Sequence, residues 1–470
     1  PDIDPDYCEV TIPGNIAPMN FVITEEGGPF QIRVTCTTGS ELLLKSSDGI
    51  VRFPERSWRK LLDGLEGGEM EIEVIAVGED QNRVRYHPFH IHVAQEPIDP
   101  YISYRFLYPG YQFWSELSIV QRCIENFRED YIAENQIIEK NCINCHSYRQ
   151  NNPDEFLIHV RGSAGGTYFV EGDKVTRTSL KTENMISGAV YPFWHPGGRF
   201  VAFSSNKVSQ NFHAAYDQNV EVYDQSSSLV IYDKERNEML DVGTEDSLTY
   251  MDTFPAWSPD GKYLYFCRAI QLKEPLLNYK KVKYNLVRKA FNQESRSFGK
   301  TETVFNAVDI DKSVSFPRIS PDGKYLVFTL HHHGTFSIWH KEADLYLLNL
   351  QTGEAIHMSV NSDETESYHS WSSNGKWMVF SSKRRDGLSA RPYFTYIKSG
   401  SEFGKPFVLP QKDPTLYDRL IKTYSVPELA PFPAPAHSRT IGRAIRSLGT
   451  PAEPGDDASS MMMGGRSQDP

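Results

Sequence analysis

Alternation of apolar and polar residues dominates the first hundred residues. The pattern is clearest at 30–34 and 71–75, where every second side chain is apolar. A period of two is typical of strands with one buried face, and Gly-rich turns such as 26–28 separate these segments. The sequence therefore predicts a small β-sandwich over residues 1–100.

The hydrophobic period changes near residue 113. Apolar side chains then recur at alternating steps of four and three residues, at Phe113, Leu117, Val120, Ile124, Phe127 and Tyr131. This spacing places them on one stripe of an amphipathic helix, which we expect to continue to about Glu139. Residues 101–155 are therefore expected to form a linker and a short helical segment between two β regions.

From residue 156 onward, strand patterns return and the sequence repeats. Four copies pair a tight turn of the Ser-Pro-Asp-Gly type with an apolar strand on each side, at 191–203, 254–266, 316–328 and 368–380. In such a turn Pro presets φ, Asp or Asn caps the backbone and Gly supplies a positive φ. Each unit is a small antiparallel sheet that cannot bury both faces alone, so the copies are expected to stack radially. We expect residues 156–415 to form a β-propeller of five or six blades.

The copies of Trp-Ser-Pro-Asp-Gly-Lys-Tyr-Leu-x-Phe resemble the WD-type repeats of TolB-like and prolyl-oligopeptidase propellers, over roughly 156–410. The chain shows no Gly-x-Ser-x-Gly elbow, which disfavours a serine hydrolase. In residues 416–470 we expect a short helix to about Tyr424. Beyond Pro431 the composition is rich in Pro, Ala, Gly and Ser, which predicts a disordered tail.

Composition and charge narrow the class of protein. An aromatic content of 12% excludes a wholly disordered chain, and 29 Pro with 32 Gly argue against a helical bundle. A net charge of −12 argues against a nucleic-acid partner. No uncharged apolar stretch approaches the roughly 20 residues of a transmembrane segment. The sequence does not decide whether a signal peptide has been removed or whether a lipid anchor lies upstream of Pro1.

The most informative motif is Cys142-Ile143-Asn144-Cys145-His146, the attachment sequence of a c-type haem. In this reading the thiols of Cys142 and Cys145 form thioethers with the haem vinyl groups, and His146 is the proximal iron ligand. A thioredoxin-like pair would need a surrounding βαβ pattern, and a zinc site would need a second pair of ligands; neither is evident. The sequence predicts one covalently attached haem c.

The sixth iron ligand is the next question. His159 lies in the apolar run 156–160, and we expect it to face the haem opposite His146, which would make the iron six-coordinate. Met185 is the alternative, because Met is the distal ligand of many cytochromes c. A structural histidine at 159 and ordinary packing of Met185 are the competing interpretations.

Other histidines could also carry chemistry. His90 and His92 share one face of a strand near His87 and could begin a metal site or cap the haem, although a polar strand end is the simpler interpretation. The run His331-His332-His333 is expected to be a solvated loop. His195 replaces the serine of its turn. His369 and Arg318 are candidate residues of the propeller funnel, with hydrogen bonding inside a blade as the structural alternative.

The order of β domain, haem motif and propeller resembles exported c-type cytochrome-like proteins of the Bacteroidota. The resemblance implies a periplasmic or outer-membrane-associated location, where covalent haem is matured, and a redox partner protein or envelope complex. We expect an electron-transfer protein with the propeller as docking platform. The alternatives are a non-catalytic scaffold of an envelope or secretion assembly and a haem-dependent oxidoreductase that uses the propeller funnel.

Overall fold

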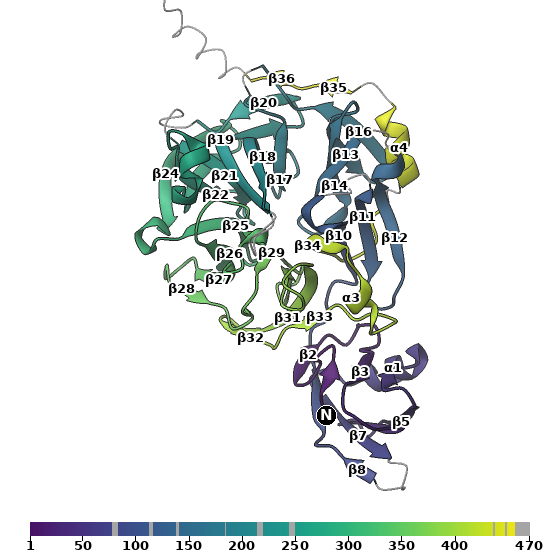
Figure 1. Ribbon diagram of the computed structural model, residues 1–470. Coiled ribbons are helices and arrows are strands. Elements are labelled where there is room, and N and C mark those ends of the chain that lie inside the picture. The colour runs from purple at the N-terminus through teal and green to yellow at the C-terminus, as the bar shows by residue number, and fades with distance from the viewer. Residues whose placement is uncertain are drawn as a thin grey trace, which may run out of the picture.

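The computed structural model describes residues 1–77, 83–111, 116–137, 141–183, 185–213, 220–243, 250–435, 438–446 and 449–455. It is mainly β, with a small domain beside a ring of sheets (Figure 1). No helix in these residues has the length and apolar character needed to span a membrane.

The N-terminal domain consists of two sheets around one apolar core, as the alternating pattern predicted. The larger sheet has the order β2-β9-β7-β4-β5, with β8 on β7, and the smaller has the order β1-β3-β6. The helix α1 packs Trp58 into the same core, where its indole donates a hydrogen bond to the carbonyl of Ile16 at 2.9 Å. The elements are β1 (Ile3–Asp4), β2 (Val10–Ile12), β3 (Phe21–Ile23), β4 (Phe30–Cys36), β5 (Glu41–Ser46), β6 (Ile50–Val51), α1 (Glu55–Leu62), β7 (Glu69–Val77), β8 (Arg83–Arg85) and β9 (Phe89–Val93).

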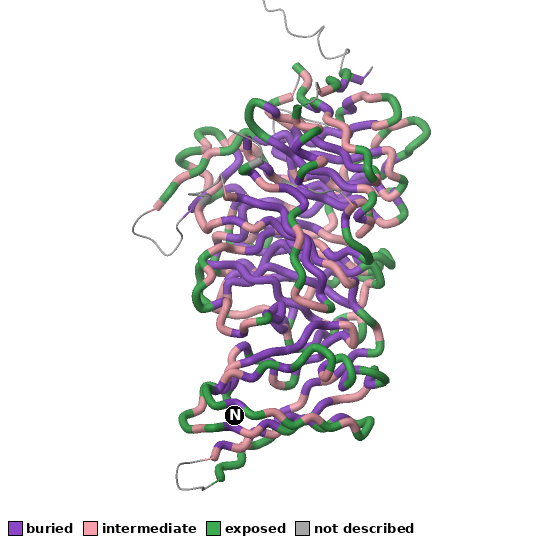
Figure 2. Tube along the Cα trace, turned by 90° about the vertical axis from the view of Figure 1, so that its right-hand side faces the viewer, coloured by how far each residue is buried: buried purple, intermediate pink, exposed green. Residues whose placement is uncertain are grey.

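Within the described residues, six further sheets form the blades of a propeller. Their innermost strands contact one another in the closed order β34, β13, β17, β21, β25, β29 and back to β34. Figure 1 shows these strands surrounding a common axis, and Figure 2 shows buried backbone running through the stacked blades. The prediction of a β-propeller is thus confirmed, with six blades.

The blades begin earlier in the chain than the repeats indicated. Blade 1 contains β10 (Tyr101–Leu107), β11 (Ser118–Cys123), β12 (Glu129–Glu134) and β34 (Thr423–Ala430); blade 2 contains β13 (Asn141–Arg149), β14 (Asn152–Gly162), β15 (Gly166–Glu171), β16 (Lys174–Ser179) and β35 (Thr450–Pro451); blade 3 contains β17 (Ala189–Trp194), β18 (Phe200–Phe212), β19 (Val220–Asp233), β20 (Glu238–Asp241) and β36 (Glu453–Pro454). The C-terminal strand β34 is the innermost strand of blade 1, so the two ends of the propeller sequence close the ring together.

Blades 3 to 6 match the four sequence repeats. Blade 4 contains β21 (Tyr250–Trp257), β22 (Tyr263–Ile270), β23 (Asn285–Asn292) and β24 (Ser297–Phe305); blade 5 contains β25 (Ser313–Ile319), β26 (Tyr325–His331), β27 (Asp344–Asn349) and β28 (Ala355–His357); blade 6 contains β29 (Glu366–Trp371), β30 (Trp377–Ser382), β31 (Arg391–Ser399), β32 (Glu402–Phe403) and β33 (Phe407–Val408). Connecting helices are α2 (Pro275–Asn278), α3 (Leu416–Arg419), α4 (Ser438–Ile445) and the 3₁₀ turns η1 (Pro109–Tyr111), η3 (Asn135–Ile137), η4 (Tyr279–Lys281), η5 (Val308–Ile310) and η6 (Ser337–Trp339).

The repeated turns work as the sequence predicted. The hydroxyl of Ser258 donates to Asp260 at 2.6 Å and accepts the backbone N–H of Tyr263 at 3.0 Å, and Gly261 has a φ of 72°. The same serine-to-carboxylate or serine-to-amide bond of 2.6 Å recurs at Ser320 and Ser372. Each turn therefore joins the innermost strand of its blade to the next strand without an unpaired hydroxyl.

Three expectations about the chain need correction. The helix expected from residue 416 to about Tyr424 is shorter, because α3 ends at Arg419 and β34 begins at Thr423. The helix expected between residues 113 and 139 is absent from the described part of that segment, which forms β11 and β12 of blade 1. The tail expected to be disordered beyond Pro431 contains regular structure in its described residues: α4 packs against β16 and β12, and the short β35 and β36 extend β16 and β20. The haem motif is accordingly not in a linker: it forms the innermost strand of blade 2.

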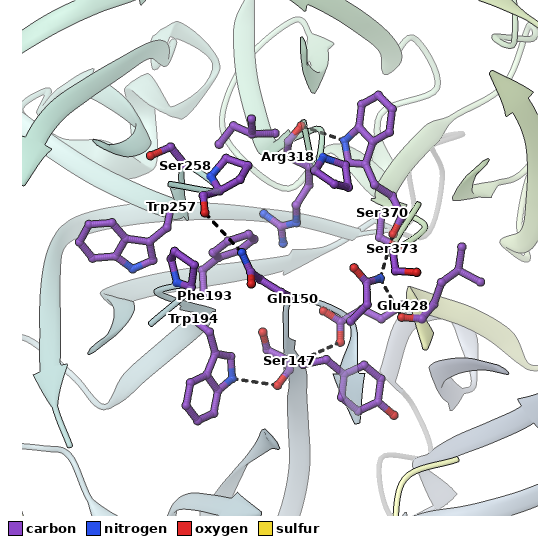
Figure 3. Close-up of a pocket in the computed structure, with 18 residues that line it drawn as sticks. Ser147, Gln150, Phe193, Trp194, Trp257, Ser258, Arg318, Ser370, Ser373 and Glu428 are labelled. Carbon is purple, nitrogen blue, oxygen red and sulfur yellow. Dashed lines mark hydrogen bonds between the residues drawn. The ribbon is translucent and has the colours of Figure 1, made fainter. Parts of the chain in front are cut away.

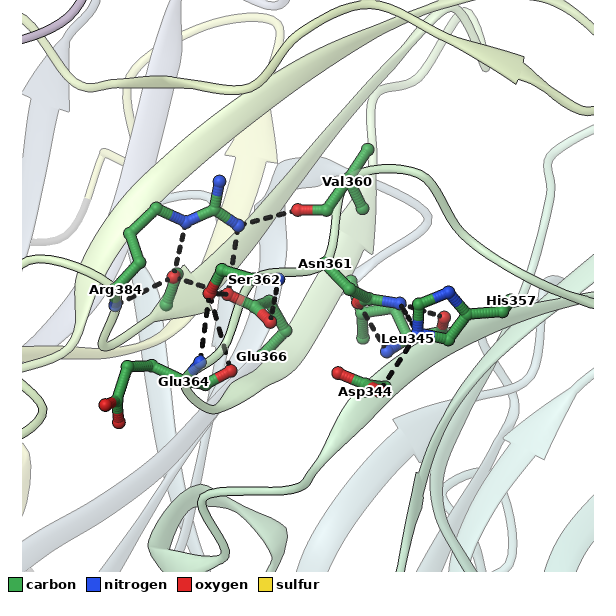
Figure 4. A network of polar contacts seen from close by, with 10 residues as sticks. Asp344, Leu345, His357, Val360, Asn361, Ser362, Glu364, Glu366 and Arg384 are labelled. Carbon is green, nitrogen blue, oxygen red and sulfur yellow. Dashed lines mark hydrogen bonds and ion pairs between the residues drawn. The ribbon is translucent and has the colours of Figure 1, made fainter.

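A buried polar network joins blades 5 and 6 (Figure 4). The carboxylate of Glu366 is fully buried and accepts hydrogen bonds from the hydroxyls of Ser362 and Ser382, both at 2.7 Å, and from Arg384 at 2.9 Å. A buried carboxylate is tolerated only when its charge is paired and its lone pairs are used. Glu366 therefore connects the first two strands of blade 6 with the loop that precedes them.

Candidate haem-attachment site in the axial channel

The haem motif lies on the axis of the propeller, in β13. A bulge interrupts this strand between Asn144 and His146, where its register to β14 shifts. Equivalent shifts interrupt the inner strands of blades 3 to 6, around the pairs Tyr191-Pro192, Phe254-Pro255, Phe316-Pro317 and Tyr368-His369. The backbone of Cys145 thus occupies the bulge position of its blade, and His146 follows it. The side chain of Cys145 lies outside the described part of the structure.

Aromatic rings from four blades meet at this level of the axis. Tyr191, Phe254, Phe316 and Tyr368 all have positive φ values between 47° and 52°. Their rings follow one another at centroid distances of 4.5, 4.1 and 4.6 Å. Bulges re-aim a side chain, and here they direct one ring of each blade toward the axis.

Two cavities occupy the two ends of the axial channel. The first, of about 400 Å³, is lined by this aromatic cluster and by Cys142, Asn144 and His146. The second, of about 340 Å³, lies where the inner strands reach their Ser-Pro-Asp-Gly turns (Figure 3). Because Arg318 lines both cavities, they belong to one channel. We call the first the haem-motif cavity and the second the turn cavity.

His146 is buried, with 3% of its surface exposed. Neither ring nitrogen makes a hydrogen bond; Nε2 lies 3.5 Å from Oε2 of Glu428. Burial, reinforced by the charge of Arg105, lowers the pKa of His146 to about 3. The imidazole is therefore neutral at physiological pH, which is the form that binds a metal.

Arginines provide positive charge on the walls of the haem-motif cavity. Arg105, Arg161 and Arg318 all line it. Arg105 is oriented by hydrogen bonds to Asn144 and to the hydroxyl of Ser425. Guanidinium groups are suited to bidentate binding of carboxylates, such as the propionates of a haem.

Glu428 and Arg318 face the channel from blades 1 and 5 (Figure 3). Burial raises the pKa of Glu428 to about 8, although Arg318 opposes the shift. Burial also lowers the pKa of Arg318 to about 10, and its guanidinium stacks over Phe193 at 4.9 Å. Glu428 is thus mostly protonated at neutral pH, while Arg318 keeps its charge.

These residues fit a covalently attached haem. The cavity combines a thiol, a neutral imidazole without a hydrogen bond, aromatic walls and arginines. Sequence reasoning identified Cys142 and His146 but not Arg105, Arg161, Glu428 or the aromatic cluster. One sequence signal could have placed the motif in a blade: Cys145-His146-Ser147-Tyr148 aligns with Tyr368-His369-Ser370-Trp371 as a further copy of the repeat.

The expected bis-histidine site is wrong, because the structure places His159 and His146 on opposite faces of the β13–β14 pair. His146 lies opposite Ile158 in the β13–β14 pair, so its side chain shares a face with Ile158. His159 is the next residue and projects from the other face, where its Nδ1 lies 3.4 Å from the hydroxyl of Thr167. Met185 packs into an apolar cluster between blades 2 and 3, outside the cavity lining.

Most of the other histidines have structural partners. His195 accepts the N–H of Gly197 at 3.0 Å, and its Nε2 lies 3.2 Å from the carbonyl of Gly261. His369 Nε2 lies 2.8 Å from the carbonyl of Val327. His90 and His92 flank the carboxylate of Glu9 on the N-terminal domain, which lies at the rim of the ring and away from the axis (Figure 1).

The run at His331 differs from the expected solvated loop. His331 is fully buried, and its ring lies 5.0 Å from that of His340. His333 is largely buried as well, with 13% of its side chain exposed, and only His332 is well exposed. The expectation failed because β26 continues through His331 between neighbouring blades.

Comparisons with known proteins concern the fold alone. No protein-family model and no curated protein matches the chain. Among solved structures, hydrazine synthase from Kuenenia stuttgartiensis is 17% identical with a TM-score of 0.31, over 55% of this chain and 64% of that one. The Dos1 propeller is 13% identical with a TM-score of 0.36, over 58% and 63% of the two chains. The β-propeller domain of Cps50 (Swd1) from Myceliophteria thermophila is 10% identical with a TM-score of 0.34, over 68% and 91%.

Proposed function

We propose that the protein is an exported monohaem c-type cytochrome that transfers electrons to or within an envelope complex, with the haem in the haem-motif cavity. The observation that carries this proposal is the position of Cys142 and His146 on the wall of one cavity, with the imidazole neutral and without a hydrogen bond. A CxxCH sequence elsewhere on a surface would lack this enclosure.

The roles of the residues follow from their chemistry. Cys142 and Cys145 would form the thioethers, and His146 would supply the proximal ligand. Arg105 and Arg161 would pair with the haem carboxylates, while the aromatic cluster excludes water and lowers the local dielectric. The bound haem would supply a one-electron redox couple.

Location and partner follow from the same proposal. Covalent haem of this type is matured on the exported side of the bacterial membrane, so the protein would function in the periplasm or at the outer membrane. Its net charge of −12 favours a redox partner with a basic docking face. The broad faces of the propeller would provide the docking surface.

A second candidate function is redox chemistry on a small ligand at the iron. The wall of the haem-motif cavity presents the rings of Tyr191, Phe254, Phe316 and Tyr368. Among the described lining residues, His146 is the one histidine and there is no methionine. This composition favours a site that admits an external ligand over one closed by a strong distal ligand.

The test is a redox titration of the haem-loaded full-length protein, followed by carbon monoxide binding to its reduced form. Reversible one-electron reduction without carbon monoxide binding supports an electron carrier. Reversible reduction with rapid carbon monoxide binding supports the ligand-dependent oxidoreductase. Haem that cannot be reduced by small mediators would contradict both and favour the scaffold.

A further inference from the structure

A second cluster of metal-ligand side chains lies away from the haem motif. It joins Glu221 on β19 with His333 and His340, which lie in the segment between β26 and β27. The β18–β19 hairpin of blade 3 is long, and it reaches past blade 4 to this segment of blade 5. Three side chains from two non-adjacent blades therefore converge on one point.

The geometry of the cluster suits a metal ion. The candidate ligand atoms of the three residues all lie within 4.8 Å of one another. Nε2 of His333 lies 3.3 Å from Oε2 of Glu221, and Nε2 of His340 lies 3.6 Å from Oε1. Ligands at about 2.0–2.1 Å from a tetrahedral zinc ion are separated by about 3.3 Å.

The side chains are shielded from solvent. Glu221 and His340 each have 2% of the side chain exposed. Nε2 of His340 makes no hydrogen bond, since its nearest carboxylate oxygen is 3.6 Å away. A buried ring nitrogen without a hydrogen bond is costly, and a metal ion would satisfy it.

The surroundings of His340 resemble the outer shell of a metal site. Its other ring nitrogen, Nδ1, lies 3.3 Å from Oε1 of Glu342, and the same oxygen lies 2.9 Å from Nδ1 of His332. Histidine ligands commonly donate their second N–H to a carboxylate, which fixes the tautomer and the ring orientation. Glu342 is placed to do this for His340.

We propose that Glu221, His333 and His340 bind a divalent transition-metal ion, with zinc as the best match to a two-histidine, one-carboxylate set. The ion would anchor the β18–β19 hairpin to blade 5. Gln210 and Val222 are paired across this hairpin and line the haem-motif cavity, whereas Glu221 is one residue along and points to the opposite side. The metal would thus stabilise a wall of the channel from behind.

The competing interpretation is that no metal binds and that a protonated, positively charged His340 pairs with Glu221 and Glu342. Although burial opposes the charge, Glu221 and Glu342 raise the pKa of His340 to about 9 when no ion is present. Metal binding would displace this proton, so the two states exclude each other. Metal content separates them directly.

The experiment measures zinc in the full-length protein by elemental analysis after equilibration with zinc chloride and gel filtration. Wild type should retain one zinc ion that the variants Glu221→Gln and His333→Ala do not retain. Glu342→Gln should weaken affinity by about 10- to 100-fold. The matched controls are His357→Ala, an exposed histidine paired with Asp344, and the double change His90→Ala with His92→Ala. Both controls should retain the ion.

Retention of zinc by the Glu221 and His333 variants, or its absence from wild type, would overturn the proposal. A second readout guards against misfolded variants: zinc should raise the unfolding temperature of wild type, and a chelator should reverse this. No shift with zinc in folded wild type also overturns the proposal. Zinc content is independent of haem iron, so the outcome does not depend on the proposed function.

Discussion

His146 and His369 occupy equivalent positions in the inner strands of blades 2 and 6. Each follows the bulge residue, where blades 3 to 5 carry Pro192, Pro255 and Pro317. His369 has a carbonyl partner at 2.8 Å, whereas His146 has no hydrogen bond and lines the cavity. We therefore infer that His369 stabilises its blade, whereas His146 is available to bind iron.

We therefore predict different spectra for three alanine variants of the haem-loaded protein. His146→Ala should lose the spectrum of a histidine-ligated haem, because the proximal ligand is gone. His159→Ala and His369→Ala should keep it, because neither ring lines the cavity. Visible absorption of the reduced proteins measures this, and an altered spectrum only for His159→Ala would restore the bis-histidine site.

Glu428 makes stability depend on pH. Burial raises its pKa from 4.5 to about 8 in the folded state, so the native protein binds an extra proton between these values. The contribution of Glu428 to the free energy of unfolding is complete below pH 4.5 and is lost as the pH rises to about 8. Glu428→Gln removes this titration.

Urea unfolding of wild type and Glu428→Gln at pH 5 and pH 8 tests this prediction. The free energy of unfolding of the variant should fall less than that of wild type across the interval. Other titrating groups are common to both proteins and cancel in the comparison. An equal fall in both would show that Glu428 is ionised throughout.

At the scale of elements, strands covered on both faces limited what the sequence could show. All six residues of β11 are buried, including Gln121 and Arg122, so the strand lacks the alternation that identifies an exposed sheet. Its apolar residues instead matched a helical period by coincidence. The turns of blades 3 to 6 were predictable because Pro, Asp and Gly determine them locally.

The CxxCH motif was singled out for its chemistry, but the sequence placed it in a linker, whereas it lies in β13 of blade 2. Its Cys145 and His146 fill positions that carry an aromatic residue and Pro in blades 3 to 5, which concealed the repeat. Arg105 and Glu428 come from segments about 300 residues apart, and only closure of the ring by β34 brings them together. Such long-range pairing has no local signal.

Ring closure by β34 predicts unequal effects of two truncations. A chain ending at Ala430 keeps β34 and loses α4, which contacts the outer strands of blades 1 and 2, and β35 and β36, which extend blades 2 and 3. Its unfolding temperature should fall by several degrees, at about 2–4 °C per kcal/mol. A chain ending at Lys422 loses the inner strand of blade 1 and should not unfold cooperatively.

Differential scanning calorimetry of the two shortened chains provides the measurement. Equal midpoints for the chain ending at Ala430 and the full chain would mean that α4 adds no stability. A cooperative transition at an unchanged midpoint for the chain ending at Lys422 would contradict closure by β34.

The network around Glu366 provides a third test at this scale. Glu366→Ala leaves the partly buried Arg384 without its carboxylate and should cost roughly 3–5 kcal/mol of unfolding free energy. The matched control is Glu364→Ala, whose carboxylate pairs with the exposed Lys341 at 2.8 Å and should cost at most about 1 kcal/mol. Chemical denaturation compares the two, and equal small losses would show that the buried contact is dispensable.

At the scale of the molecule, the N-terminal domain packs on the rim of the ring. The indole of Trp377 in blade 6 donates to the carbonyl of Glu96 at 3.0 Å, and Arg385 pairs with Asp4 at 2.5 Å. This position leaves the axis of the ring uncovered by the domain (Figure 1). The haem motif, the arginines and the aromatic cluster therefore belong to the propeller alone.

The central claim is that haem is covalently attached at Cys142 and Cys145 in the channel. The direct measurement is acid–acetone extraction followed by a pyridine haemochrome spectrum, on protein from a host that matures c-type haem. We predict one haem per chain that resists extraction, loss of that resistance in Cys142→Ala and its retention in the control Cys8→Ala. Haem that extracts from wild type, or protein without haem, would contradict the account.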